Sequence, residues 1–137
     1  MEQKINARLV IEAQGKPAEY VKERLETHVA KIKEVPGAEV YEAKFDEASE
    51  VQEGLFSSLV DVGVKADNFE TLAALVIGFG PSAIVIMEPD RIEITARELQ
   101  NSLNDVAALL HNLAQSNLDL RVDSFITKAR AAQERKE

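Results

Sequence analysis

Charged residues at alternating positions are the first candidates for chemistry in this sequence. Arg8 and Glu12 lie in a stretch where apolar and polar residues alternate, and Asp61 lies in a second such stretch. Residues two apart in a strand point to the same face, so these side chains would share one face of a sheet. We therefore expect Arg8 to form an ion pair with Asp61 or Glu12. The alternative is that the same face binds a polar ligand or partner.

Glu88 is the fourth candidate for a ligand site. It ends the apolar run 83–87 directly before Pro89, where its side chain can point into a cleft or can be an ordinary charge at a strand end. Both histidines, His28 and His111, lack the HxxxH or HExxH spacing of a zinc site, and the chain has no cysteine. We expect no metal and no cofactor, and we assign no catalytic residue, since neither a nucleophile nor a histidine stands in the same pattern.

The glycines Gly78 and Gly80 suggest a phosphate-binding loop at first sight. Such a loop needs a strand before it and a helix after it, because the helix N-terminus supplies free N–H groups. Here the order is reversed, with a helical pattern before Gly78 and an apolar strand pattern after Pro81. The sequence therefore predicts that Gly78 or Gly80 ends a helix in the left-handed conformation.

Two strand patterns and one helix pattern make up the first half of the chain. Apolar residues alternate from Ile5 to Ala13, which predicts a strand with one buried face. A helix then begins near Pro17 and ends at Pro36-Gly37. Residues 39–45 predict a second strand, with Tyr41, Ala43 and Phe45 on one side. The helix has one apolar stripe, formed by Ala18, Val21, Leu25, Val29 and Ile32.

The acidic stretch 46–53 is predicted to be an exposed hairpin loop. A third strand follows over about 55–66, in which Gly63 marks a bulge or a close approach of another group. Asp67 and Glu70 have the spacing of a capping box for a second helix. The run 83–87 is apolar at every position, which is typical of a strand covered on both faces or one in contact with another chain.

The resulting order, β-α-β-β-α-β, predicts an α+β fold of the ferredoxin-like kind, with an antiparallel sheet and two helices on one face. In that topology the first and third strands are central. A further helix over about 95–115 begins at the capping box Thr95–Glu98. It packs either on its own sheet or on another subunit. Its apolar stripe consists of Leu99, Leu103, Val106, Leu110 and Leu113.

The predicted domains are a ferredoxin-like domain with the added helix over 1–115 and a C-terminal extension over 116–137. Ser116-Asn117 is a predicted break in the chain's regular structure. Beyond it, the alternation of Leu118, Leu120 and Val122 predicts a short strand, and 124–135 predicts a helix.

The net charge of −8 and the pI of about 4.9 argue against a nucleic-acid partner, because an acidic surface repels phosphates. Residues 128–137 carry a local charge of +2, typical of a solvated basic helix end. No apolar run approaches the roughly 20 residues of a membrane helix. We expect a cytoplasmic protein without a membrane partner.

The segment 79–92, FGPSAIVIMEPDRI, follows a helical pattern and precedes a leucine-rich one. It resembles the end of the ferredoxin-like C-terminal domain of WYL-type transcription regulators, where a helix runs into a similar turn and strand. The likeness covers about a third of the chain. It implies the ferredoxin-like fold, but no regulatory role and no catalytic residue, because the sequence shows neither a helix-turn-helix nor a WYL core. The βαββαβ order is also similar to ACT-like small-molecule-sensing domains.

The hypothesis that follows is a non-enzymatic, self-associating module that senses a small ligand or acts as a scaffold. One alternative is an enzyme of unknown class using Glu12, Asp61 or Glu88 near a subunit interface. Another is an acidic module whose loop 46–53 binds a basic protein; the spacing in that loop is not that of a calcium hand.

Overall fold

The computed structural model describes residues 4–114 and 118–136, which divide into two units at Ser102/Leu103. The first unit contains β1 (Ile5–Gly15), α1 (Ala18–Lys33), β2 (Ala38–Phe45), β3 (Ser49–Gln52), β4 (Leu55–Ala66), α2 (Phe69–Phe79) and β5 (Ala83–Glu88). Helix α3 (Ala96–Ala114) starts in the first unit and continues into the second, which also holds α4 (Leu118–Lys136).

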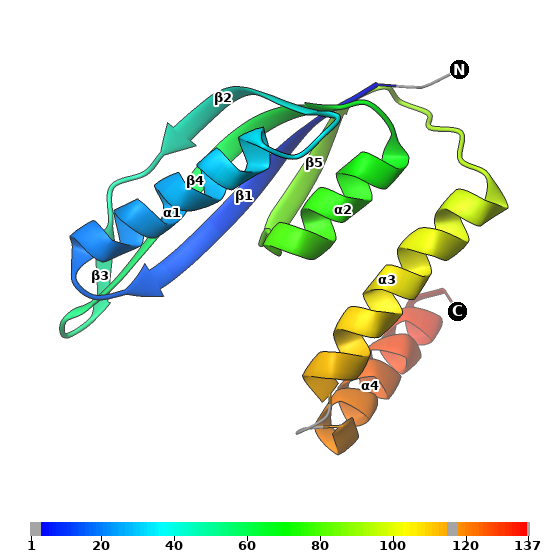
Figure 1. Ribbon diagram of the computed structural model, residues 1–137. Helices are drawn as coiled ribbons and strands as arrows, with labels where there is room; N and C mark the ends of the chain where they lie inside the picture. Colours follow the sequence, from blue (N-terminus) through cyan, green and yellow to red (C-terminus); the bar gives the residue numbers. More distant parts are fainter. Residues whose placement is uncertain (1–3, 115–117, 137) are drawn as a thin grey trace. The chain divides into compact units, whose positions relative to one another are not determined.

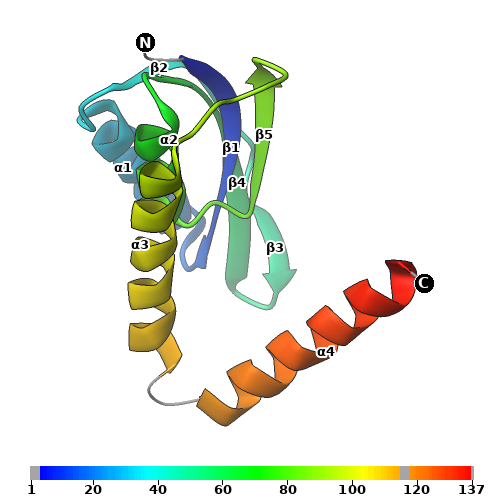
Figure 2. The same cartoon turned by 90° about the vertical axis from the view of Figure 1, so that its right-hand side faces the viewer.

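The strands form one antiparallel sheet in the order β2-β4-β1-β5. The short strand β3 pairs with the first residues of β4. Both α1 and α2 lie on one face of this sheet (Figures 1 and 2). The ferredoxin-like prediction is confirmed, including the central position of β1 and β4. The outer strands are β2 and β5, so each presents one edge of its backbone to its surroundings.

The core lies between the sheet and the two helices, as the alternation predicts. Side chains of β1 and β4 that face the helices are essentially inaccessible to solvent, and the stripe of α1 packs onto them. Of that stripe, only Ala18 is not fully buried. The fully buried β-strand residues include Ile5, Ala7, Leu9, Ile11, Val60, Val62 and Val64.

Helix α2 ends as predicted, but begins one residue later than predicted. Gly80 takes the left-handed conformation with φ 57°, and its N–H donates to the carbonyl of Val76. At the other end, Asn68 and not Asp67 is the cap, since its Oδ1 accepts a 2.9 Å hydrogen bond from the N–H of Thr71. The backbone N–H of Asp67 instead donates to the carbonyl of Gly37.

The predicted acidic loop is partly a strand. Residues Ser49–Gln52 form β3, which pairs with the start of β4 through a turn at Gly54. All four side chains of β3 are exposed. The sequence carries no burial pattern for such a ribbon, because its backbone pairs while none of its side chains enters the core.

The C-terminal helices correct one prediction. The cap of α3 is confirmed by the hydrogen bond from the Glu98 N–H to Thr95 Oγ1. Residues 118–122 are helical, so the predicted strand is wrong; period-two alternation over five residues does not by itself separate strand from helix. Ser116-Asn117 falls outside the described residues. None of the described helices has the length and apolar character needed to cross a bilayer.

Candidate functional site

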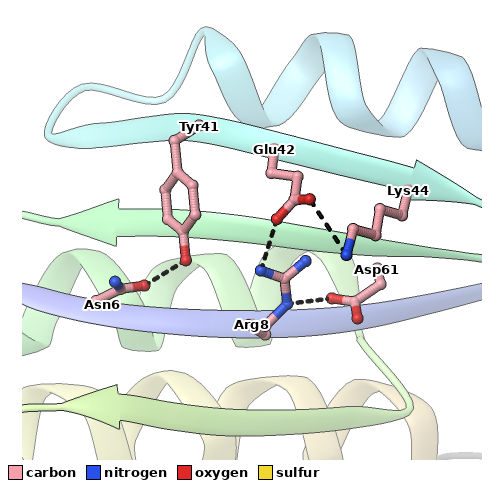
Figure 3. A network of polar contacts seen from close by, with 6 residues as sticks. All are labelled: Asn6, Arg8, Tyr41, Glu42, Lys44 and Asp61. Carbon is pink, nitrogen blue, oxygen red and sulfur yellow. Dashed lines mark hydrogen bonds and ion pairs between the residues drawn. The ribbon is translucent and has the colours of Figure 1, made fainter.

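Arg8 and Asp61 meet on the open face of the sheet, opposite the helices. The Arg8 Nε donates a 2.8 Å hydrogen bond to Asp61 Oδ1, and Nη1 donates a 3.0 Å bond to Glu42 Oε2 (Figure 3). Lys44 adds a 3.3 Å contact to the other Glu42 oxygen. The predicted ion pair is therefore confirmed for Asp61 and not for Glu12. Glu42 and Lys44 of β2 also take part in this group of ion pairs, and the sequence analysis did not predict them.

Arg8 reaches Glu42 across an intervening strand. Arg8 of β1 and Glu42 of β2 both pair with Gly63, which lies between them on β4. The guanidinium of Arg8 therefore spans β4 to reach a carboxylate two strands away. One arginine thus ties together the three strands β1, β4 and β2.

The ring of Tyr41 lies over Gly63. A Cβ atom placed on Gly63 would lie 2.6 Å from Cζ of the Tyr41 ring, so the ring rests directly on the glycine. The Tyr41 hydroxyl donates a 2.6 Å hydrogen bond to Asn6 Oδ1, and Lys65 Nζ lies 5.7 Å from the ring centroid. We call the residues Asn6, Arg8, Tyr41, Glu42, Lys44, Asp61 and Lys65 the open-face network.

The predicted placement of Tyr41 beside Ala43 and Phe45 is wrong. A register shift between Val40 and Glu42 inserts an extra residue into β2 at this point. A bulge of this kind changes the face to which the following residues point. Ala43 therefore packs against the core while Tyr41 lies on the open face. The Gly63 prediction is confirmed, since the glycine sits opposite the bulge and under the ring.

The charges of the open-face network shift two pKa values. Hydrogen bonds to Asp61 and then Glu42 raise the pKa of Arg8. Hydrogen bonds from Arg8 and then Lys44 lower the pKa of Glu42. The ion pairs join two positive groups, Arg8 and Lys44, to two negative groups, Glu42 and Asp61, so these four charges compensate one another. The Arg8 Nη2 is buried without a hydrogen-bond partner in the described part of the chain.

Glu12 and Glu88 do not join Arg8 and Asp61. Glu12 pairs with Leu59 and lines a hollow of ≈ 220 Å³ beside the β2–β3 connection. Glu88 pairs with Asn6 and lines a different hollow of ≈ 360 Å³ with Lys4, Lys65 and Pro89. Six residues of β1 separate these two places, roughly 20 Å in an extended strand. The four predicted site residues, which lie on β1, β4 and β5, therefore do not form one cluster.

The histidine on α1 is packed against a neighbouring aromatic ring. His28 packs edge-on against Phe79 at a centroid distance of 6.3 Å, and its Nδ1 is buried without a partner in the described residues. Burial, followed by the charges of Arg24 and Lys31, lowers the pKa of His28. Within residues 4–114 and 118–136, no three His, Asp or Glu side chains are placed to hold a metal ion.

A family model, the MJ0538 family, matches residues 6–134. The chain belongs to the MJ0538 family. The match runs from β1 into α4 and so includes residues of both units. No curated protein and no solved structure matches the sequence, and no relative found supports a relation to WYL-type regulators or ACT-like domains.

In this member of the MJ0538 family, β5 is an outer strand with uncovered apolar side chains. All six of its residues are exposed, and Val85 and Met87 retain 54% and 55% of their accessible surface. Ile84 and Ile86 point to the helix side, since they pair with Leu9 and Ala7 of β1, yet both are also exposed. The uniform apolar run was the signal in the sequence.

Helix α3 carries a second apolar surface in this MJ0538-family chain. Its five stripe residues recur at alternating steps of four and three, and all five are exposed. This spacing is that of a helix packing against another helix. Whether the stripe packs on its own sheet or on another subunit stays a prediction.

Proposed function

We propose that the chain is a non-enzymatic module that associates with further copies of itself and acts as a scaffold. The observation that carries this proposal is the exposed apolar surface of β5. Four consecutive large apolar side chains, Ile84 to Met87, retain 40% to 55% of their accessible surface on an outer strand. Contiguous apolar surface of this kind marks a site of protein association.

The stripe of α3 supports the same proposal independently. Leu103 and Leu110 are more exposed than a helix normally leaves its apolar face, and leucines at this spacing favour a partner helix. If the stripe packs between chains, as we propose, it adds apolar area to the association of a chain of net charge −8.

The open-face network supports a structural role rather than ligand sensing. Arg8 and Asp61, the central residues predicted to bind a ligand, bond to each other, and Glu42 takes a second bond of Arg8. A polar ligand would have to displace these charge-assisted bonds, which are stronger than neutral ones. The scaffold role is therefore the one we favour.

The test is the mass of the full chain in solution. Light scattering coupled to gel filtration, together with sedimentation velocity, should give a dimer or larger assembly of the 15.1 kDa chain at micromolar concentration. Glu42→Gln should keep that mass, because Glu42 lies on β2, at the opposite edge of the sheet from β5. A monomer throughout the micromolar range would contradict the proposal.

A further inference from the structure

We infer that the partner of β5 is β5 of a second copy, paired antiparallel about a two-fold axis at Val85. This inference rests on the proposed self-association and names its interface. One edge of β5 bonds to β1, and the other edge leaves its backbone N–H and C=O groups without a strand partner in the described residues. An unpaired strand edge is a template for another strand.

The register follows from the pleat of the strand. Residues directly opposite each other in an antiparallel pair point to the same face, so a two-fold axis must pass through a residue and not between two residues. Centred on Val85, the pairing places Ile84 opposite Ile86. The alternation of β5 is regular from Ala83 to Ile86, and a register shift against β1 follows at Met87. The helix side then joins four isoleucines from two copies.

Other registers fit less well. An axis at Ile86 would set Ile84 opposite the carboxylate of Glu88. An axis at Ile84 would leave Met87 opposite Pro81, which has no N–H to donate. Only the axis at Val85 overlaps the whole uncharged run 83–87 with itself.

Charge also favours this self-pairing. Two copies of an acidic chain repel each other over most of their surfaces. The run 83–87 carries no charge, and an axis at Val85 places Glu88 opposite Ser82 of the partner, so that the two Glu88 carboxylates lie at opposite ends of the pair. Lys4 and Lys65 line the hollow around Glu88 in its own chain and offset its charge there.

The first experiment uses the absence of cysteine in the native sequence. An axis at Val85 brings the two Val85 Cα atoms to about 4.5–5.5 Å, within the range that a disulfide bridges. Under diamide, Val85→Cys should form a covalent dimer. Ile84→Cys alone should form little, whereas a mixture of Ile84→Cys and Ile86→Cys should form the mixed dimer. Val51→Cys, on exposed β3, is the control and should remain monomeric in denaturing gels.

The second experiment changes the charge at the axis. Val85→Lys should weaken association at least ~100-fold, because two ammonium groups would meet within an apolar contact. Val51→Lys is the matched control: Val51 is 51% exposed on another strand, so this variant should keep the parent mass. Circular dichroism should show both variants folded.

The outcomes separate this inference from the proposed function. An assembly that persists in Val85→Lys, or one in which Val85→Cys fails to crosslink, would overturn the β5 pairing while leaving self-association in place. A parent chain that is monomeric throughout would overturn both. Selective crosslinking at Val85 together with dissociation of Val85→Lys supports the two-fold at this residue.

Discussion

The two outer strands of the sheet, β2 and β5, both pair antiparallel with a central strand, and each pairing contains one register shift. Their free edges differ in the charges that they carry. The exposed positions of β2 include Glu39 and Lys44, and a bulge interrupts the strand at Tyr41. Between Ala83 and Met87, β5 carries only aliphatic and methionine side chains. Charges on an edge hinder pairing with a further strand, whereas an uncharged apolar edge favours it.

The comparison separates two tasks within one sheet. The β2 side is tied into its own chain by Arg8 and Tyr41, which fix it to β4 and β1 through side chains on the open face. The β5 side has backbone pairing with β1 but little side-chain burial. The chain therefore completes one edge by itself, and we propose that it completes the other by association.

The largest expected change in stability comes from one of two residues that pair across β1 and β5. Leu9 on β1 and Ile84 on β5 lie opposite each other, but Leu9 is fully buried and Ile84 is not. Leu9→Ala should reduce the free energy of unfolding by about 2–5 kcal/mol, because it leaves a cavity in the core. Ile84→Ala should cost clearly less than Leu9→Ala in the isolated chain, since Ile84 keeps 40% of its accessible surface.

Urea unfolding at a protein concentration low enough to give the monomer measures both values. Repeating the Ile84→Ala measurement at high concentration should reveal an additional loss, because the variant also weakens assembly. An equal cost for Leu9→Ala and Ile84→Ala in the monomer would mean that β5 is part of the chain's own core, and the contrast between the two edges would not hold.

Much of this fold follows from local patterns of burial. The alternation in β1 and β4 and the stripe of α1 directly predict the faces that form the core, because side-chain direction follows the repeat of the backbone. Gly80 could be predicted as a helix end because glycine readily takes the left-handed conformation found there. The strand β3 and the cap at Asn68 could not, because a ribbon without buried side chains has no burial pattern, and Asn68 and Asp67 are comparable caps.

The candidate site was predicted less completely than the fold. Arg8 and Asp61 were expected to meet because the ferredoxin-like order makes β1 and β4 neighbours. Glu42 was missed because alternation gives its face but does not show that Arg8 reaches across β4 to β2. The bulge changes the face of Tyr41, and no local pattern announces it. The signal that was present is Gly63, a glycine inside a strand that indicated a close approach without naming the group that approaches.

The second prediction tests how the β2 edge is held. Gly63→Ala places a methyl group within 2.6–2.9 Å of the Tyr41 ring, so the ring must leave its position over β4. We expect a loss of about 1–2 kcal/mol in the free energy of unfolding, from the hydrogen bond to Asn6 and the packing of the ring. Urea unfolding measures the loss.

Two further variants make this result specific. In a Tyr41→Ala background, Gly63→Ala should cost much less, because the clash partner is absent; equal costs in both backgrounds would exclude the ring as the cause. Gly78→Ala is the control, since this helical glycine has no neighbouring atom within 4 Å of an added Cβ. It should leave stability unchanged or raise it by up to about 1 kcal/mol.

The smallest expected effect is a pH dependence confined to the β2 edge. The folded-state pKa of Glu42 lies below its ordinary value because Arg8 and Lys44 bond to the carboxylate. A lowered pKa means that the stabilisation is complete above the unfolded-state pKa, about 4.3, and is lost as the pH falls through the folded-state value. Glu42→Gln should therefore be less stable than the parent at pH 6, and the difference should shrink below pH 4.

Urea midpoints of the two proteins at pH 6, 5, 4 and 3 measure this convergence. The assembly should respond differently, because the run 83–87 of β5 contains no titrating group. The dimer fraction of Glu42→Gln should therefore equal that of the parent at pH 6. If Glu42→Gln dissociated the assembly, then β2 and not β5 would be the edge at which copies meet, since only a residue near the interface can change association without unfolding the chain.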